Sequence, residues 1–149
     1  MSVSPEILDR LKTVDLFEAL SSRDLEHVAA VGRRVDHHAG KEIVTEGGGS
    51  AGFHLILEGE AAINVGGNAR PSLRPGQYFG EISMLDGKPR TASVTAGGEG
   101  LATFSIASWD FHGLLEKYPT ITKPIIVNLC SRLRTAEARV ALGSPGAQA

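Results

Sequence analysis

The chain has 149 residues, with 15 Lys and Arg against 17 Asp and Glu, and a formal net charge of −2. This length suits one domain with its own core, and the charge does not favour nucleic acid or an anionic membrane as a partner. Cys130 is the only cysteine; this excludes a disulfide framework and favours a small apolar helix residue over a reactive thiol. No stretch reaches the roughly 18 apolar residues of a membrane helix. Residues 1–10 lack the layout of a signal peptide, so we expect a soluble, cytoplasmic protein.

The first third of the chain predicts helices. Ser4, Pro5 and Glu6 supply a cap, a proline at the first helical position and an acid in the first turn. Residues 16–20 form a short apolar segment. Ser21 and Asp24 have the spacing of a capping box, in which Asp replaces the usual Glu or Gln. Apolar residues at helical spacing then follow at Leu25, Val28 and Ala29.

From about residue 33 the pattern changes to short strands. Most of the 18 glycines fall between residues 40 and 100, which is typical of tight turns between strands. Turns are expected at 58–60, 66–68, 75–76 and 97–98. The pattern predicts about eight strands: one near Val35, one ending near Phe79, and others at 43–44, 53–57, 61–65, 72–73, 91–95 and 101–106. We therefore expect a mainly β domain, a jelly-roll-like β-roll (double-stranded β-helix) flanked by helices.

The last third predicts two helices. Ser108 is a plausible N-cap for a helix with apolar residues at 111, 114 and 115, which Pro119 ends. A longer amphipathic helix starts near Pro124; its apolar residues are Ile125, Ile126, Leu129, Leu133, Ala136 and Val140. The domain is expected to span 1–142, with a disordered tail over 143–149.

Residues 76–94 carry the chemistry. Gly80 follows a strand and lets the backbone approach a ligand closely. Residues 81–85 have room for one helical turn whose free amides would attract an anion. Arg90 is expected to enter the next strand, with its guanidinium meeting a phosphate. Glu81 would repel that phosphate, so it fits better as an acceptor for a sugar hydroxyl.

This segment resembles the phosphate-binding cassette of the cyclic-nucleotide-binding domain family, found in catabolite regulators, cyclic-nucleotide-dependent kinases and gated channels. The matching runs are 79–85 and 89–94, and the likeness extends over 46–47, 53–60 and 73–76, within roughly 13–141. The resemblance implies that Glu81 binds the ribose 2′-hydroxyl, that Arg90 binds the cyclic phosphate, and that amides of the short helix complete the cradle. The predicted ligand-binding residues are Phe79, Gly80, Glu81, Ile82, Ser83, Arg90, Thr91 and Ala92.

Base preference is left open by this pattern. In the family, threonine after the arginine is able to bond the guanine amino group, yet some members with threonine prefer cAMP. Strand propensity explains Thr91 about as well. We therefore expect cAMP as the favoured ligand with cGMP also accepted. The chain departs from the family in a glycine-rich loop at 46–52, expected to be mobile, and in a short connection at 66–71.

Other functions have weaker support in the sequence. Glu81 and Arg90 would contribute only about 0–1 kcal/mol as a surface ion pair. His37, His38, His54 and Glu58 invite a metal site, but their spacing favours a solvated strand end for His37 and His38. No nucleophile, base and orienting group stand together, so no enzyme is expected. Arg132, Arg134 and Arg139 fit a solvated helix face better than a DNA contact.

The resemblance implies a regulatory sensor that needs no cofactor besides its cyclic nucleotide. The last two helices would act as a lid, with a residue of 129–136 covering the base and Leu133 the first candidate. Ligand binding would shift the last helix. The output would pass to an unidentified effector protein, with homodimer formation as another possibility, and without direct contact to nucleic acid or membrane. The alternatives are an interaction scaffold or a regulatory fragment of a larger kinase, transporter or acetyltransferase.

Overall fold

The computed structural model describes residues 4–44, 47, 52–88 and 90–142, apart from the side chains of Ser83 and Met84. The described helices are α1 (Pro5–Lys12), α2 (Ser22–Val31), α3 (Glu81–Asp86), α4 (Ser108–Lys117) and α5 (Thr122–Ala141), with 3-10 turns η1 (Asp15–Phe17) and η2 (Pro119–Ile121). The described strands are β1 (Arg33–His37), β2 (Glu42–Val44), β3 (Phe53–Val65), β4 (Asn68–Leu73), β5 (Tyr78–Phe79) and β6 (Ser93–Ile106).

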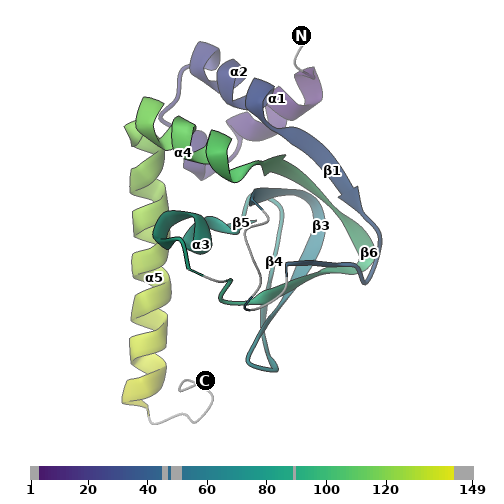
Figure 1. Ribbon diagram of the computed structural model, residues 1–149, viewed down its shortest axis with the longest axis vertical. Coiled ribbons are helices and arrows are strands. Elements are labelled where there is room, and N and C mark those ends of the chain that lie inside the picture. The colour runs from purple at the N-terminus through teal and green to yellow at the C-terminus, as the bar shows by residue number, and fades with distance from the viewer. Residues whose placement is uncertain (1–3, 45–46, 48–51, 89, 143–149) are drawn as a thin grey trace.

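The strands form one antiparallel sheet that curls into a roll. Its path is β1-β6-β3-β4, with β2 paired to β6 and β5 paired to β3. The two long strands β3 and β6 pair with each other along most of their length and with the other strands on either side. Figure 1 shows α1 and α2 at one end of the roll and α5 running along its side, with α3 between α5 and the strands. The predicted β-roll with flanking helices is confirmed.

The described residues contain six strands instead of the predicted eight, because two pairs of expected strands are continuous. Segments 53–57 and 61–65 belong to β3, and segments 91–95 and 101–106 merge in β6, which starts at Ser93. The predicted turn at 58–60 is a bulge in β3, where Gly59 has φ +85° and the register with β6 shifts. A Cβ on Gly59 would lie 2.3 Å from the carbonyl oxygen of Gly100. Glycine therefore bends this strand without ending it.

The helix boundaries follow the predicted caps with one exception. Ser4 Oγ accepts a hydrogen bond from Ile7 N at 3.5 Å, and Ser21 Oγ accepts one from Asp24 N at 3.1 Å. The N-cap of α4 is Ala107, not Ser108, and it makes no side-chain cap bond. The expected disordered tail lies outside the described residues, as does most of the glycine-rich loop. In the part of the chain that is described, no helix is both long and apolar enough to cross a membrane.

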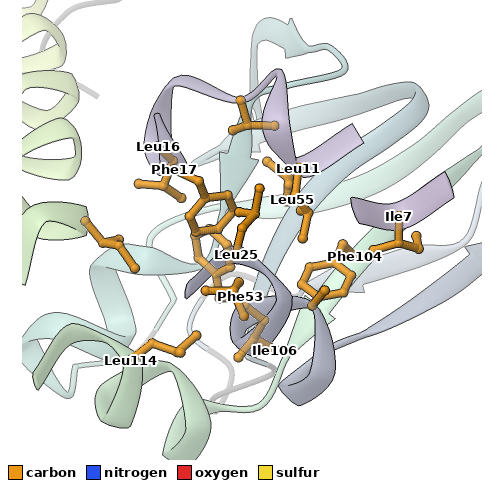
Figure 2. Packing of buried hydrophobic residues seen from close by; sticks show 14 of the residues in the cluster. Ile7, Leu11, Leu16, Phe17, Leu25, Phe53, Leu55, Phe104, Ile106 and Leu114 are labelled. Atoms are coloured by element: carbon orange, nitrogen blue, oxygen red, sulfur yellow. The ribbon is translucent and has the colours of Figure 1, made fainter. Parts of the chain in front are cut away.

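Two apolar clusters stabilise the roll. The larger one joins the N-terminal helices to β3 and β6 and also receives residues of α4 and α5. Figure 2 shows Leu11, Phe17, Phe53 and Phe104 among its side chains, and the rings of Phe53 and Phe111 stack with centroids 4.5 Å apart. The smaller cluster fills the roll beside β5, with Phe79 among its buried residues. Because β5 leads directly into α3, this packing positions the start of the predicted cassette.

The long helix α5 is attached mainly through its first turns. Ile125 is buried, whereas Ile126, Leu133 and Val140 are more than half exposed. The amphipathic pattern predicted for this helix is therefore only partly buried against the domain. Most of its length is free of the apolar core.

Candidate functional site

A cavity of about 610 Å³ lies between the roll and α5, within the range of roughly 300–1,000 Å³ typical of small-molecule sites. Strands β2 to β6 line one side, and α5 lines the other. Seven of the eight predicted ligand-binding residues line it: Phe79, Gly80, Glu81, Ile82, Arg90, Thr91 and Ala92. The exception is Ser83, which lies in α3 and whose side chain is not described.

Arg90 is held in place by backbone carbonyls. Its Nη1 donates to Gly80 O at 2.8 Å and its Nη2 donates to Gly52 O at 3.1 Å. The residue is 4% exposed, and burial lowers the pKa of its guanidinium, with the charge of Glu81 acting in the opposite direction. Its Nε has no partner among the described residues. A buried cation that keeps unused donors is suited to bind an anion.

Gly80 makes this anchoring possible. It has φ +97°, and a Cβ there would lie 2.3 Å from Gly52 O and 2.9 Å from Arg90 Nη1. Only glycine therefore fits between β5 and α3 without moving the arginine. The expectation that strand β6 holds Arg90 is wrong: the residue precedes β6 by three positions, and the two carbonyls hold it instead.

Glu81 begins α3 and is 3% exposed. Burial raises the pKa of its carboxyl, and the positive charge of Arg132 and the backbone amides of Ile82 and Glu81 lower it. Oε1 lies 3.5 Å from Arg132 Nη1 on α5, whereas Oε2 has no partner among the described residues. The alternative of a surface ion pair between Glu81 and Arg90 is wrong, because both side chains are buried.

Comparison with known proteins assigns the domain that carries Glu81 and Arg90 to a family. The family profile described as Cyclic nucleotide-binding domain matches residues 34–118, which is more than half of the chain. The chain belongs to the cyclic nucleotide-binding domain family. The match covers β1 to α4 and includes both Glu81 and Arg90.

Relatives of the domain include whole regulatory proteins. A cAMP-dependent protein kinase regulatory subunit of Eremothecium gossypii is 36% identical over 89 residues, which cover 59% of this chain and 19% of that protein. A cGMP-dependent protein kinase of Toxoplasma gondii is 27% identical over 130 residues, covering 87% of this chain and 12% of the kinase. The chain thus spans about a fifth of the length of the first of these relatives.

Solved structures share the fold of the domain. The catabolite activator protein of Thermus thermophilus superposes with a TM-score of 0.77 at 28% identity, over 87% of this chain and 62% of that one. A structure described as cAMP bound PfPKA-R (141-441) superposes with a TM-score of 0.78 at 22% identity, over 93% of this chain and 46% of that one. The second likeness concerns the fold alone.

The structure adds pocket residues of α5 to those of the cassette. The face of α5 toward the cavity carries Asn128, Ser131, Arg132, Thr135, Ala136 and Arg139, and four of them lie within the segment 129–136 that was expected to cover the base. Arg132 was expected to be solvated; its side chain is 52% exposed and still pairs with Glu81. Leu133, the first candidate for the base cover, is 60% exposed and does not line the cavity. In the sequence, the signal for this pocket face was the set of polar residues on α5 that are spaced three or four positions apart beside its apolar residues.

Tyr78 of β5 is a further missed residue. It lines the cavity, and its buried hydroxyl interacts with Asn128 of α5. Burial, and then the charge of Glu81, raises the pKa of Tyr78 to about 12, whereas the interaction with Asn128 lowers it. The phenol therefore stays protonated at neutral pH and is available as a hydrogen-bond donor.

The histidines considered as metal ligands serve another purpose. His37 is buried, so the expectation of a solvated strand end holds only for His38, which is exposed. His37 Nε2 lies 3.0 Å from Thr103 Oγ1, and His54 Nδ1 lies 2.8 Å from Ser105 Oγ. His54 also stacks on Phe79, with ring centroids 4.9 Å apart. Among the described residues, no group of three or more His, Cys, Asp or Glu side chains is arranged to hold a metal ion.

Proposed function

We propose that this chain binds a cyclic nucleotide, with cAMP favoured and cGMP accepted, in the cavity between the roll and α5. The observation that carries the proposal is the buried, carbonyl-anchored Arg90 beside a buried Glu81. The arginine would bind the cyclic phosphate and the glutamate would accept a bond from the ribose 2′-hydroxyl. The relatives, which include a regulatory subunit of a cAMP-dependent protein kinase and a cGMP-dependent protein kinase, support this ligand class.

Several parts of the cavity must contribute to the affinity. A charged hydrogen bond contributes about 1.5–3 kcal/mol, whereas micromolar binding needs about 8 kcal/mol. Arg90 alone is therefore insufficient. The amides at the start of α3, the ribose contact and packing of the base against the apolar wall, which includes Ile63 and Leu73, would supply the rest.

Calorimetry with cAMP and cGMP side by side tests the proposal. Arg90→Ala should abolish measurable binding, because it removes the phosphate partner. Arg74→Ala is the matched control, since the Arg74 side chain is 77% exposed and lies outside the cavity lining. Circular dichroism checks that both variants fold. Near wild-type affinity in folded Arg90→Ala, or no binding of either nucleotide by the unaltered chain, would contradict the proposal.

We further propose that the ligand acts by repositioning α5, as a regulatory sensor without catalytic activity that works in the cytoplasm. The ligand would bridge the roll and a helix whose outer length is largely exposed, and it would favour the arrangement it contacts more. Hydrogen exchange in residues 123–141 should then slow on adding cAMP. Unchanged exchange there would exclude the lid while leaving binding itself intact.

The output partner belongs to the same proposal. Exposed Ile126, Leu133 and Val140 lie seven residues apart on α5 and outside the cavity lining, a spacing typical of helix pairing. This surface supports contact with an effector protein or a second copy of the chain, and sedimentation in solution tests the homodimer. The scaffold alternative predicts no nucleotide binding. The length of the full gene distinguishes a regulatory fragment of a larger protein from a stand-alone sensor.

A further inference from the structure

The ion pair between Glu81 and Arg132 joins two elements that are 51 residues apart in the chain. Arg132 Nη1 lies 3.5 Å from Glu81 Oε1. The two ends of the pair differ in environment, because the Glu81 side chain is 4% exposed and that of Arg132 is 52% exposed. The pair thus connects the buried start of α3 to the solvated side of α5.

Arg132 is the main compensation for the charge of Glu81. Among the influences that lower the pKa of this carboxyl, the charge of Arg132 is the largest, ahead of the amides of Ile82 and Glu81. Arg90 and Tyr78 also interact with the carboxylate. Arg90, however, uses its terminal nitrogens on the carbonyls of Gly80 and Gly52. Beside the amides of the chain itself, the side chain that contacts the Glu81 carboxylate directly is therefore on α5.

The second carboxylate oxygen of Glu81 is the one that remains for a ligand. Oε2 of Glu81 is buried and has no partner among the described residues, which is costly for a carboxylate. Glu81 itself lines the cavity. A hydroxyl donor from a ligand would satisfy this oxygen while Arg132 keeps hold of the other one.

We propose that Arg132 is a positioning residue that holds the Glu81 carboxylate for the ribose 2′-hydroxyl, so that discrimination between ribose and 2′-deoxyribose depends on a side chain of α5. The inference rests on the proposed function, because it presupposes a cyclic nucleotide in the cavity. It adds a residue outside the cassette and gives it a role that acts through Glu81. Without Arg132, Glu81 keeps its place but loses its orientation and its charge compensation.

Calorimetry with cAMP and 2′-deoxy-cAMP tests this role. The unaltered chain should prefer cAMP by about tenfold or more, the value of one hydrogen bond to a charged group. Arg132→Gln should reduce this ratio severalfold, mainly by weakening cAMP. Arg134→Gln is the matched control, because Arg134 is an exposed arginine of the same helix outside the cavity lining. Arg132→Lys, which keeps the charge, should restore part of the ratio.

A pH profile separates this role from a structural one. Protonation of Glu81 weakens its acceptor role, so cAMP affinity should fall as the pH drops through the pKa of this carboxyl. Removing the Arg132 charge raises that pKa further, and the midpoint of the profile should move to higher pH in Arg132→Gln. Arg90 and Tyr78 remain in both proteins and contribute equally to both profiles.

The outcomes are distinguishable from failure of the proposed function. If the unaltered chain binds neither nucleotide, both proposals fail together. If the unaltered chain binds cAMP and Arg90→Ala does not, the proposed function stands. The ratio of cAMP affinity to 2′-deoxy-cAMP affinity in Arg132→Gln then decides whether Arg132 positions Glu81. An unchanged ratio in Arg132→Gln, which includes an equal loss for cAMP and 2′-deoxy-cAMP, overturns the role of Arg132, and so does a pH midpoint that does not move.

Discussion

Gly80 offers the sharpest test of how the cavity is built. Gly80→Ala introduces two separate penalties. The residue has φ +97°, and its new Cβ would lie 2.3 Å from Gly52 O and 2.9 Å from Arg90 Nη1. Because the carbonyl oxygen of Gly52, just before β3, and a buried guanidinium are both in the way, either the backbone at residue 52 or the arginine must move.

The expected loss of stability follows from two costs, one of backbone conformation and one of the displaced arginine. A left-handed conformation costs an alanine about 1–2 kcal/mol. Displacing the guanidinium also weakens its bond to Gly80 O, and a charged hydrogen bond is worth about 1.5–3 kcal/mol. We expect Gly80→Ala to lower the free energy of unfolding by about 3 kcal/mol and to weaken cyclic nucleotide binding at least tenfold, since the phosphate partner is displaced.

Gly87→Ala is the matched control. Gly87 follows α3 with φ +71°, but a Cβ there has no atom within 4 Å. This variant isolates the conformational cost, about 1–2 kcal/mol, and should leave binding unchanged. Urea unfolding gives the stabilities and calorimetry with cAMP gives the affinities. The reasoning is refuted if the two variants lose equal stability, or if Gly80→Ala binds cAMP as tightly as Gly87→Ala does.

Two further predictions concern parts of the domain away from the cassette. Ile125→Ala should lower the free energy of unfolding by about 2–5 kcal/mol, because Ile125 is 1% exposed. Leu133→Ala should change it by less than about 0.5 kcal/mol, because Leu133 is 60% exposed. Similar losses for the two variants in urea unfolding would contradict the described attachment of α5. Burial lowers the pKa of His37, so the unfolded chain binds its proton first, and stability should fall as the pH drops below about 6.5, the unperturbed value. Unfolding midpoints at pH 7.5 and 5.5 should differ less in His37→Gln, and an unchanged difference would show that another group titrates.

Helix caps and tight turns could be predicted from the sequence, because they depend on residues that are neighbours in the chain. Ser4 and Ser21 cap helices as their spacing indicates, and the glycine pair at 66–67 closes the hairpin between β3 and β4 as expected. The cassette was equally visible, because Gly80, Glu81 and Arg90 lie within eleven consecutive residues. These features depend on neighbours in sequence, and a single sequence contains that information.

The features that were missed depend on long-range pairing. The local sequence predicts a turn at Gly59, yet its strand continues because β6 runs opposite it and the bulge fits the carbonyl of Gly100. The local sequence also predicts a solvated His37, yet Thr103, far along the chain, gives it a buried partner. Neither partner is identifiable from the local sequence, since a strand's neighbour sets its burial.

The same reason explains why the sequence alone predicts a solvated Arg132. On α5 its position is defined by Glu81, which belongs to another element. The two charged residues of the cassette are thus held differently: Arg90 by backbone carbonyls within the roll, and Glu81 by a half-exposed side chain of α5. The carbonyls of Gly52 and Gly80 immediately precede β3 and α3, whereas α5 is anchored in the core mainly near Ile125. Under the proposed function, Arg90 at the phosphate end is therefore held by the backbone, and the carboxylate at the ribose end depends on where α5 lies. We expect a ligand that needs both ends to favour one position of α5.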